Sequence, residues 1–196
     1  MFIDYVTLLL VNMGAGFIVL AAYLFHGLQQ EDQRGWAVAF AAVGMIALLF
    51  GTHMCWTWPL AGPFNVAFGE TSVLLGTIFL AIAACVWRRC SFAALGIYTF
   101  FAGGAAVVLG ARIADLGLTM WPGVSALGFI LSGLAGMLFG PATVLKQRGR
   151  LRSLTAGVLI LAAIAWLGIG YLAYWMHIDS FQDWQPNTVI VREAEK

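Results

Sequence analysis

The chain alternates between long apolar runs and short polar segments, and the pattern occurs six times. The apolar runs cover about residues 2–27, 36–57, 70–87, 91–118, 124–145 and 154–176. About 20 apolar residues in a helix cross the hydrocarbon core of a bilayer, whereas a spanning strand needs only about 10 residues of alternating polarity. The runs do not alternate. The pattern therefore predicts an all-α, polytopic membrane protein, a six-transmembrane-helix bundle.

This prediction divides the chain into a transmembrane domain at residues 1–178 and a short extracytoplasmic tail at residues 179–196. Two prolines in the segment 58–69 predict a loop there, because proline does not continue a helix. The tail contains a strand-like run at residues 188–191. An even number of spans places both ends of the chain on the same side of the membrane.

Basic residues give the bundle a predicted orientation. Seven of them lie in or beside the three loops that share one side: Arg34, Arg88, Arg89, Lys146, Arg148, Arg150 and Arg152. Loops rich in Lys and Arg stay in the cytoplasm. We therefore expect those three loops to be cytoplasmic, and both termini and the segment 58–69 to be extracytoplasmic.

Composition supports the membrane prediction and excludes other classes. Hydrophobic residues make up 62% of the chain and charged residues 10%, and the mean hydropathy is +0.90. Soluble domains are about half apolar and about a quarter charged. The net charge of +1 does not suggest nucleic acid as a partner, so we expect the lipid bilayer to be the main one.

Polar residues inside or at the ends of the spans are the candidate functional residues. Ionisable groups within a membrane are costly and mark functional sites. The candidates that fall toward the predicted outer face are Asp4, His53, Glu70, Arg112, Asp115 and His177. They come from five different spans, so we expect the bundle to bring them together as a ligand or proton-relay site. Arg112 and Asp115 are three residues apart, which places them on one helix face.

Three uses of such a cluster stay open. His53, His177 and Glu70 offer ligands for zinc, copper or iron, and the two histidines offer axial ligands for a haem. Alternatively, the cluster relays protons, or binds a small polar solute or a quinone headgroup. In the third interpretation the polar groups only satisfy one another and fix the packing of the helices. No sequence motif signals haem, copper or quinone, and no catalytic motif is present.

The cysteines and glycines suggest packing roles. Cys55, Cys85 and Cys90 lack the spacing of a disulfide framework or a thiolate metal site, and we expect them to pack as small apolar residues. The 23 glycines predict close helix packing. Some of them recur at an offset of 59 residues, which suggests that spans two and three are repeated as spans four and five. That repeat places Arg112 at the position equivalent to His53.

Three segments of the chain resemble a known family. The opening MFIDYVTLLLVNMGAGFIVLAAY, the segment GTHMCWTWPLAGPFNVAFGE and the run IYTFFAGGAAVVLGARIADLGLT are similar to the bacterial and archaeal integral membrane family called domain of unknown function 981. The resemblance extends over about residues 1–145. It implies a small multi-span protein of a prokaryotic cytoplasmic membrane, and it brings no activity or residue roles with it.

The functional expectation follows from these observations together. Since catalytic motifs and soluble mass are both lacking, we expect a non-catalytic membrane subunit or accessory protein, in a redox or respiratory assembly, with a polar site near its outer face. A small transporter or proton and solute conduit is one alternative. A haem-, quinone- or metal-binding membrane protein is the other. Expected partners are the lipid bilayer and either further copies of the chain or the subunits of a membrane complex.

Overall fold

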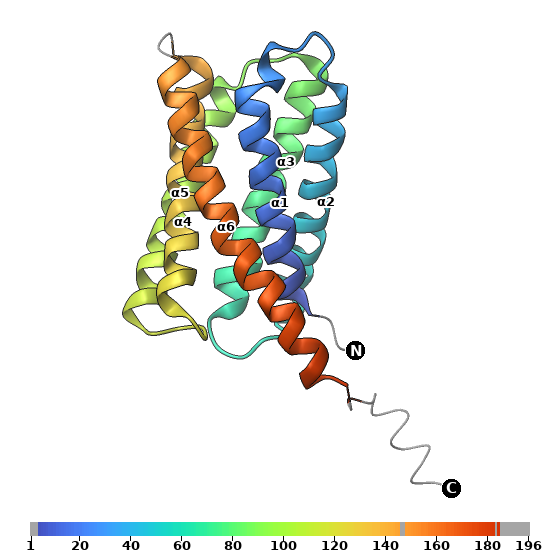
Figure 1. The fold of residues 1–196 in the computed structure, drawn as a ribbon, viewed down its shortest axis with the longest axis vertical. Helices are drawn as coiled ribbons and strands as arrows, with labels where there is room; N and C mark the ends of the chain where they lie inside the picture. The colour runs from blue at the N-terminus through green and yellow to red at the C-terminus, as the bar shows by residue number, and fades with distance from the viewer. Residues whose placement is uncertain (1–3, 146–147, 183, 185–196) are drawn as a thin grey trace, which may run out of the picture.

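The computed structural model describes residues 4–145, 148–182 and 184, and this part of the chain is helical without strands. Its six long helices are α1 (Tyr5–Phe25), α2 (Arg34–Thr57), α3 (Thr71–Arg88), α4 (Ala93–Asp115), α5 (Pro122–Val144) and α6 (Arg148–Ser180) (Figure 1). A short 3-10 helix, η1 (Gly27–Gln29), follows α1, and a π-helix, η2 (Asn65–Glu70), leads into α3. All six long helices are long and apolar enough to cross a membrane. The predicted six-helix architecture is therefore confirmed.

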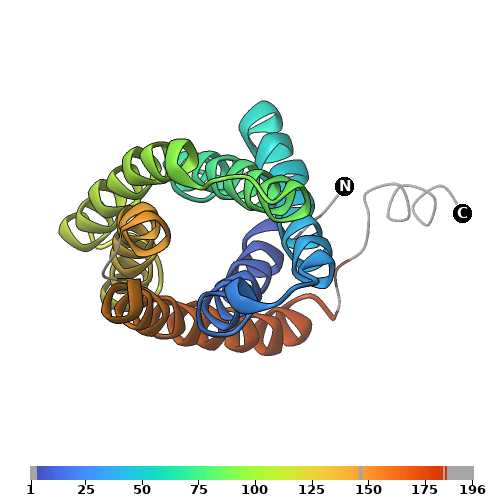
Figure 2. The same ribbon diagram turned by 90° about the horizontal axis from the view of Figure 1, so that it is seen from above.

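Viewed along their axes, the helices form a ring (Figure 2). α1 packs between α2 and α6, α2 pairs with α3, and α4 pairs with α5, which in turn packs on α6. α3 and α4 meet over far fewer residues than these pairs do. The ring is thus closed firmly everywhere except between α3 and α4. α6 runs diagonally across one side of the bundle and joins α5 to α1 (Figure 1).

Glycines set the spacing of the two helix pairs. A Cβ added to Gly44 of α2 would lie 2.9 Å from the carbonyl oxygen of Gly76 on α3, and one added to Gly103 of α4 would lie 2.4 Å from the carbonyl oxygen of Gly133 on α5. Such backbone contact is possible only without side chains. The two hairpins therefore pack in the same way, as expected if spans two and three recur as spans four and five.

α1 begins and α6 ends at the same end of the bundle, here called the termini end (Figure 1). α2 and α4 also end there, and α3 and α5 begin there, because successive helices run antiparallel. Which side of the membrane the termini end faces stays a prediction. The strand-like run at residues 188–191 lies outside the described residues.

Two predicted boundaries were wrong. α6 begins at Arg148 rather than near residue 154, because arginine is a good helix former. The predicted loop at 58–69 is helical from its seventh residue onward. There the buried Asn65 side chain accepts a hydrogen bond from the Leu60 amide at 3.2 Å and donates one to the Leu60 carbonyl at 2.6 Å. These two bonds close the loop early, and the π-helix follows directly.

Candidate functional site

The first turn of α1 is joined to the last turns of α6 through Asp4. Asp4 caps α1, since its carboxylate accepts a 3.4 Å hydrogen bond from the Thr7 amide. Its other oxygen accepts a bond from His177 Nδ1 at 2.6 Å. The Thr7 hydroxyl lies 3.2 Å from the same ring nitrogen. Both ionisable side chains are partly open, with 25% of Asp4 and 37% of His177 exposed. This network is therefore partly accessible from outside the bundle.

The same turn of α1 holds a second histidine through Tyr5. The Tyr5 hydroxyl lies 2.9 Å from His53 Nδ1, and the two rings stack with their centroids 5.4 Å apart. Thr57 donates a 2.8 Å hydrogen bond to the His53 carbonyl, and its hydroxyl lies 3.3 Å from His53 Nδ1. Because Asp4 and Tyr5 are neighbours in the chain, α1 places the two histidines on either side of its own beginning.

Glu70 does not join either network. It is exposed in a surface depression between α2 and α3, beside Thr52, Cys55 and Trp56. Its carboxylate makes no hydrogen bond or ion pair with any described residue. On α2, residues 52, 55 and 56 form one stripe, and His53 points in a different direction. Glu70 therefore faces a different side of α2 from His53.

Arg112 and Asp115 form an ion pair with each other in the last turn of α4. Their side chains are 59% and 63% exposed. The pair occupies its own place at the termini end and takes no part in the networks of Asp4 and Tyr5. Of the six candidates, the structure thus gathers Asp4, His53 and His177 around α1 and leaves the other three at the periphery.

The metal ligands considered for this site do not gather in one place. Within the described residues there is no group of three or more His, Cys, Asp and Glu side chains that could hold a metal ion. His53 bonds through Nδ1 to Tyr5 of α1, and His177 bonds through Nδ1 to Asp4, the residue that caps α1.

A chamber of about 290 Å³ opens beside His177 at the termini end. Its polar lining is the imidazole of His177 together with the hydroxyls of Thr7, Thr119 and Ser125. The rest is apolar or aromatic: Val6, Leu10, Leu60, Phe64, Phe68, Met120, Trp121, Trp166, Ile169, Ala173 and Met176. We call this space the end chamber. Its volume is close to the smallest typical of small-molecule sites, roughly 300 Å³.

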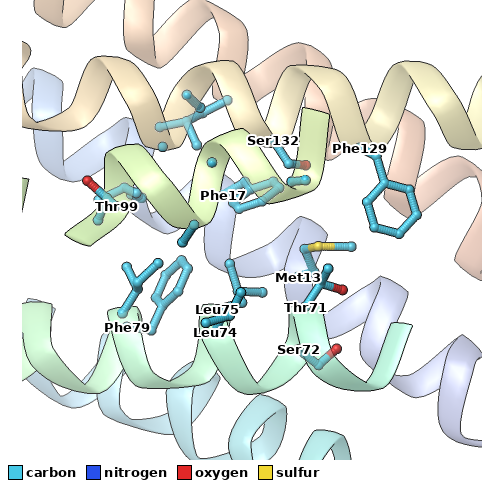
Figure 3. Close-up of a pocket in the computed structure, with 18 of the residues that line it drawn as sticks. Met13, Phe17, Thr71, Ser72, Leu74, Leu75, Phe79, Thr99, Phe129 and Ser132 are labelled. Carbon is cyan, nitrogen blue, oxygen red and sulfur yellow. The ribbon is translucent and has the colours of Figure 1, made fainter. Parts of the chain in front are cut away.

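A second space, the central cavity, lies deeper in the ring and has a volume of about 90 Å³ (Figure 3). Met13, Phe17, Leu75 and Phe79 are among the apolar side chains around it. Its lining also includes the hydroxyls of Thr71, Ser72, Thr99 and Ser132. Those of Thr99 and Ser132 donate to carbonyls of their own helices, and that of Thr71 donates to the Ala67 carbonyl of η2. The central cavity is therefore suited to hydrocarbon.

The two spaces adjoin at a group of aromatic side chains. Leu10 and Phe68 line both of them. The Phe68 ring packs against Phe129 at 5.4 Å, and Phe129 meets Trp166 edge to face at 5.1 Å. Trp166 is held by a 2.9 Å hydrogen bond from its indole nitrogen to Ser132. Phe68 belongs to the π-helix η2, a type of irregularity that is frequent at functional sites.

The central cavity approaches the bilayer between α3 and α4. Leu74 and Ile78 line it from α3, and the small side chains of Ala102 and Ala106 line it from α4. All four are only partly buried. Since these helices have the weakest contact of any neighbours in the ring, this seam is the most open side of the cavity.

Sequence reasoning did not select Thr7, Tyr5, Phe68 or Trp166. Tyr5 and Thr7 lie one and three residues after Asp4, within the same first turn, which is the signal that links them to it. Trp166 is a tryptophan in the middle of an apolar run, away from the membrane boundaries where this residue is enriched. Phe68 carries no comparable signal.

Comparison with known families decides where the chain belongs. The family model described as Protein of unknown function (DUF981) matches residues 1–180. The chain is a member of DUF981. The match includes all six helices and both spaces, so the resemblance seen in the sequence is confirmed and extends beyond residue 145. No curated protein and no solved structure matches this DUF981 protein.

Proposed function

We propose that this DUF981 protein binds a neutral amphiphilic lipid of the quinone class. The head lies in the end chamber beside His177, and the first part of the hydrocarbon tail lies in the central cavity. The observation that carries the proposal is the arrangement of these two spaces. A chamber lined by an imidazole and hydroxyls adjoins a mainly apolar cavity, and Leu10 and Phe68 line both spaces.

The charge of the lining favours a neutral head. Among the described residues that line the two spaces there is no Lys or Arg. Phosphate and carboxylate heads are recognised mainly by such cations. A quinone carbonyl instead needs a hydrogen-bond donor, and reduction to the quinol also consumes protons. The imidazole of His177, backed by Asp4, suits both requirements.

The apolar cavity argues against the competing functions. A conduit for protons or polar solutes is lined by available polar groups, whereas the hydroxyls of Thr71, Thr99 and Ser132 in the central cavity donate to backbone carbonyls. His53 and His177 bond to residues on either side of the beginning of α1, an arrangement that does not favour two axial ligands of one haem. The quinone site is compatible with the expectation of a membrane subunit or accessory protein in a redox assembly, because quinones carry electrons between such assemblies.

Titration of the full-length protein in detergent micelles tests the site. The probe is a short-chain quinone, and the signal is quenching of tryptophan fluorescence, since Trp121 and Trp166 line the end chamber. We expect saturable quenching. His177→Ala should weaken binding by about tenfold, the equivalent of losing one hydrogen bond to a charged or polarised group. His26→Ala, an exposed histidine at the opposite end of the bundle, is the matched control.

Two neighbouring alanines test the position of the tail. Ala106→Phe places a ring in the central cavity, whereas Ala105→Phe places it on the exposed face of α4. We expect Ala106→Phe, but not Ala105→Phe, to weaken the binding of a long-tailed quinone more than the binding of a tailless one. Linear, non-saturable quenching, or equal affinities for the histidine variants, would refute the site. Equal effects of the two alanine variants would refute the position of the tail.

The subunit role needs a separate measurement. Extraction of the native membrane in a mild detergent should recover this protein together with redox subunits in fixed proportion. Recovery of the chain alone would contradict that role without affecting the quinone site. An absorbance spectrum of the same preparation distinguishes haem from quinone, because haem has a strong visible band.

A further inference from the structure

At the opposite end of the bundle, the end of α3 brings two cysteines together. Arg89 has φ 56° and ψ 36°, the left-handed conformation that often ends helices. The Cys90 amide donates to the Cys85 carbonyl at 3.0 Å, and the Arg89 amide donates to the Val86 carbonyl at 3.3 Å. These two bonds define a Schellman motif, which is frequently accompanied by contact between the side chains of its first and last residues.

In this protein the first and last residues of the motif, Cys85 and Cys90, both carry thiols. Cys85 and Cys90 are free cysteines at the two ends of this motif, and both line the same cavity. Sequence spacing does not reveal the pair, because a separation by four residues does not match any redox or metal motif. The contact arises only when α3 ends in a left-handed residue between them.

The two thiols are also accessible. Both line a cavity of about 260 Å³, together with Gln30 and Glu31 of the α1–α2 connection. Cys90 is exposed and Cys85 is partly exposed. Arg89 donates a 2.6 Å hydrogen bond to the Glu31 carbonyl, which fixes the turn against that connection. A small reagent can thus reach a dithiol whose backbone is already held in place.

We propose that Cys85 and Cys90 form a redox-active dithiol that closes to a disulfide. The oxidant is a low-molecular-weight disulfide of the glutathione class. The Cys90 thiolate attacks one sulfur of that disulfide and releases one thiol, leaving a mixed disulfide on Cys90. The Cys85 thiolate then attacks the Cys90 sulfur and releases the second thiol. One S–S bond forms and one breaks, and the two protons of the dithiol leave with the two released thiols.

The predicted orientation gives this pair a role. The arginines beside it place this end in the cytoplasm by the positive-inside rule. Disulfides are rare there and, where they occur, are usually transient and redox-sensing. Oxidation ties the last turn of α3 to the connection that leads to α4, beside the seam between these two helices. The dithiol therefore responds to the thiol redox state of the cell, independently of any ligand in the end chamber.

Mass spectrometry of trypsin-digested full-length protein tests the proposal. Trypsin cuts after Arg88 and Arg89, so Cys85 and Cys90 fall on separate peptides that only a disulfide can hold together. After equilibration in micelles with oxidised glutathione, we expect the joined peptides and a loss of both thiols. Cys55→Ser, a cysteine at the far end of α2, should leave this result unchanged. Cys85→Ser should instead trap glutathione on Cys90.

Each alternative outcome is distinguishable. Two free thiols after oxidation, or a Cys90–glutathione adduct with free Cys85 in the parent protein, would show that the pair makes only a packing contact. Joined peptides in the Cys55→Ser background and none with Cys85→Ser or Cys90→Ser would establish the disulfide. Circular dichroism of the serine variants confirms that they fold, so a missing bond is not a consequence of unfolding.

Discussion

The contact between α4 and α5 predicts a sharp difference between two neighbouring glycines. A Cβ at Gly103 would lie 2.4 Å from the Gly133 carbonyl oxygen and 3.0 Å from the Met137 amide nitrogen. Ordinary contacts begin near 3.4 Å, so the helices must separate by about 1 Å. A Cβ at Gly104 would meet nothing within 4 Å. Gly103→Ala should therefore destabilise the bundle, whereas Gly104→Ala should not.

The expected magnitude follows from the cost of overpacking. Inserting one carbon into a close-packed contact costs roughly 1–3 kcal/mol. Alanine is intrinsically better than glycine in a helix by up to about 1 kcal/mol, and both variants share that gain. We therefore expect the free energy of unfolding of Gly103→Ala to be about 2 kcal/mol lower than that of Gly104→Ala. For a chain of this size that difference is roughly 4–8 °C in Tm.

Thermal unfolding in detergent micelles, followed by circular dichroism, measures the difference. Gly133→Ala should reproduce the effect of Gly103→Ala, because its Cβ would lie 2.4 Å from the Gly103 carbonyl oxygen. The double variant should cost less than the sum of the two, since the first substitution already separates the helices. Equal Tm values for Gly103→Ala and Gly104→Ala would refute the close contact between α4 and α5.

Three further substitutions test other parts of the fold. Asn65→Ala removes both side-chain bonds to Leu60 and should cost about 1–3 kcal/mol, with faster hydrogen exchange at the Leu60 amide. Trp166→Phe keeps the aromatic packing but loses the hydrogen bond to Ser132. A double-mutant cycle with Ser132→Ala should give an interaction energy of about 1 kcal/mol for this bond. Arg112→Ala removes an exposed ion pair, so its Tm should change by less than about 2 °C, and a larger loss would mean that the pair is structurally important.

The sequence predicts the spans well but does not predict which side chains meet. Long apolar runs specify a membrane helix by their length alone, and all six were correct in number and approximate position. The runs are apolar on nearly every side, so they carry no stripe that distinguishes the interior face from the lipid face. The rotation of each helix is then set by packing. This is why spacing alone could not predict that His53 contacts Tyr5 of α1. Nor could it predict that Glu70 lies at the surface between α2 and α3.

The pairing of Asp4 with His177 has a different origin. The two residues are 173 positions apart, at opposite ends of the chain, and meet only because six antiparallel helices close into a ring. The even number of spans predicts that they share a side of the membrane. Their contact depends on α6 crossing diagonally onto α1, which no local pattern encodes. The Schellman contact between the two cysteines, by contrast, is local and could have been anticipated from a helix end at Arg88.

The length of α6 makes the site sensitive to the bilayer. The helix has 33 residues and is about 50 Å long, against roughly 30 Å of hydrocarbon. Membranes accommodate such an excess by tilting the helix, and thinner bilayers demand more tilt than thicker ones. His177 lies near the end of α6 and would move as the helix tilts, whereas Asp4 caps α1. Lipid thickness should thus act on the hydrogen bond between them, and so on the mouth of the end chamber.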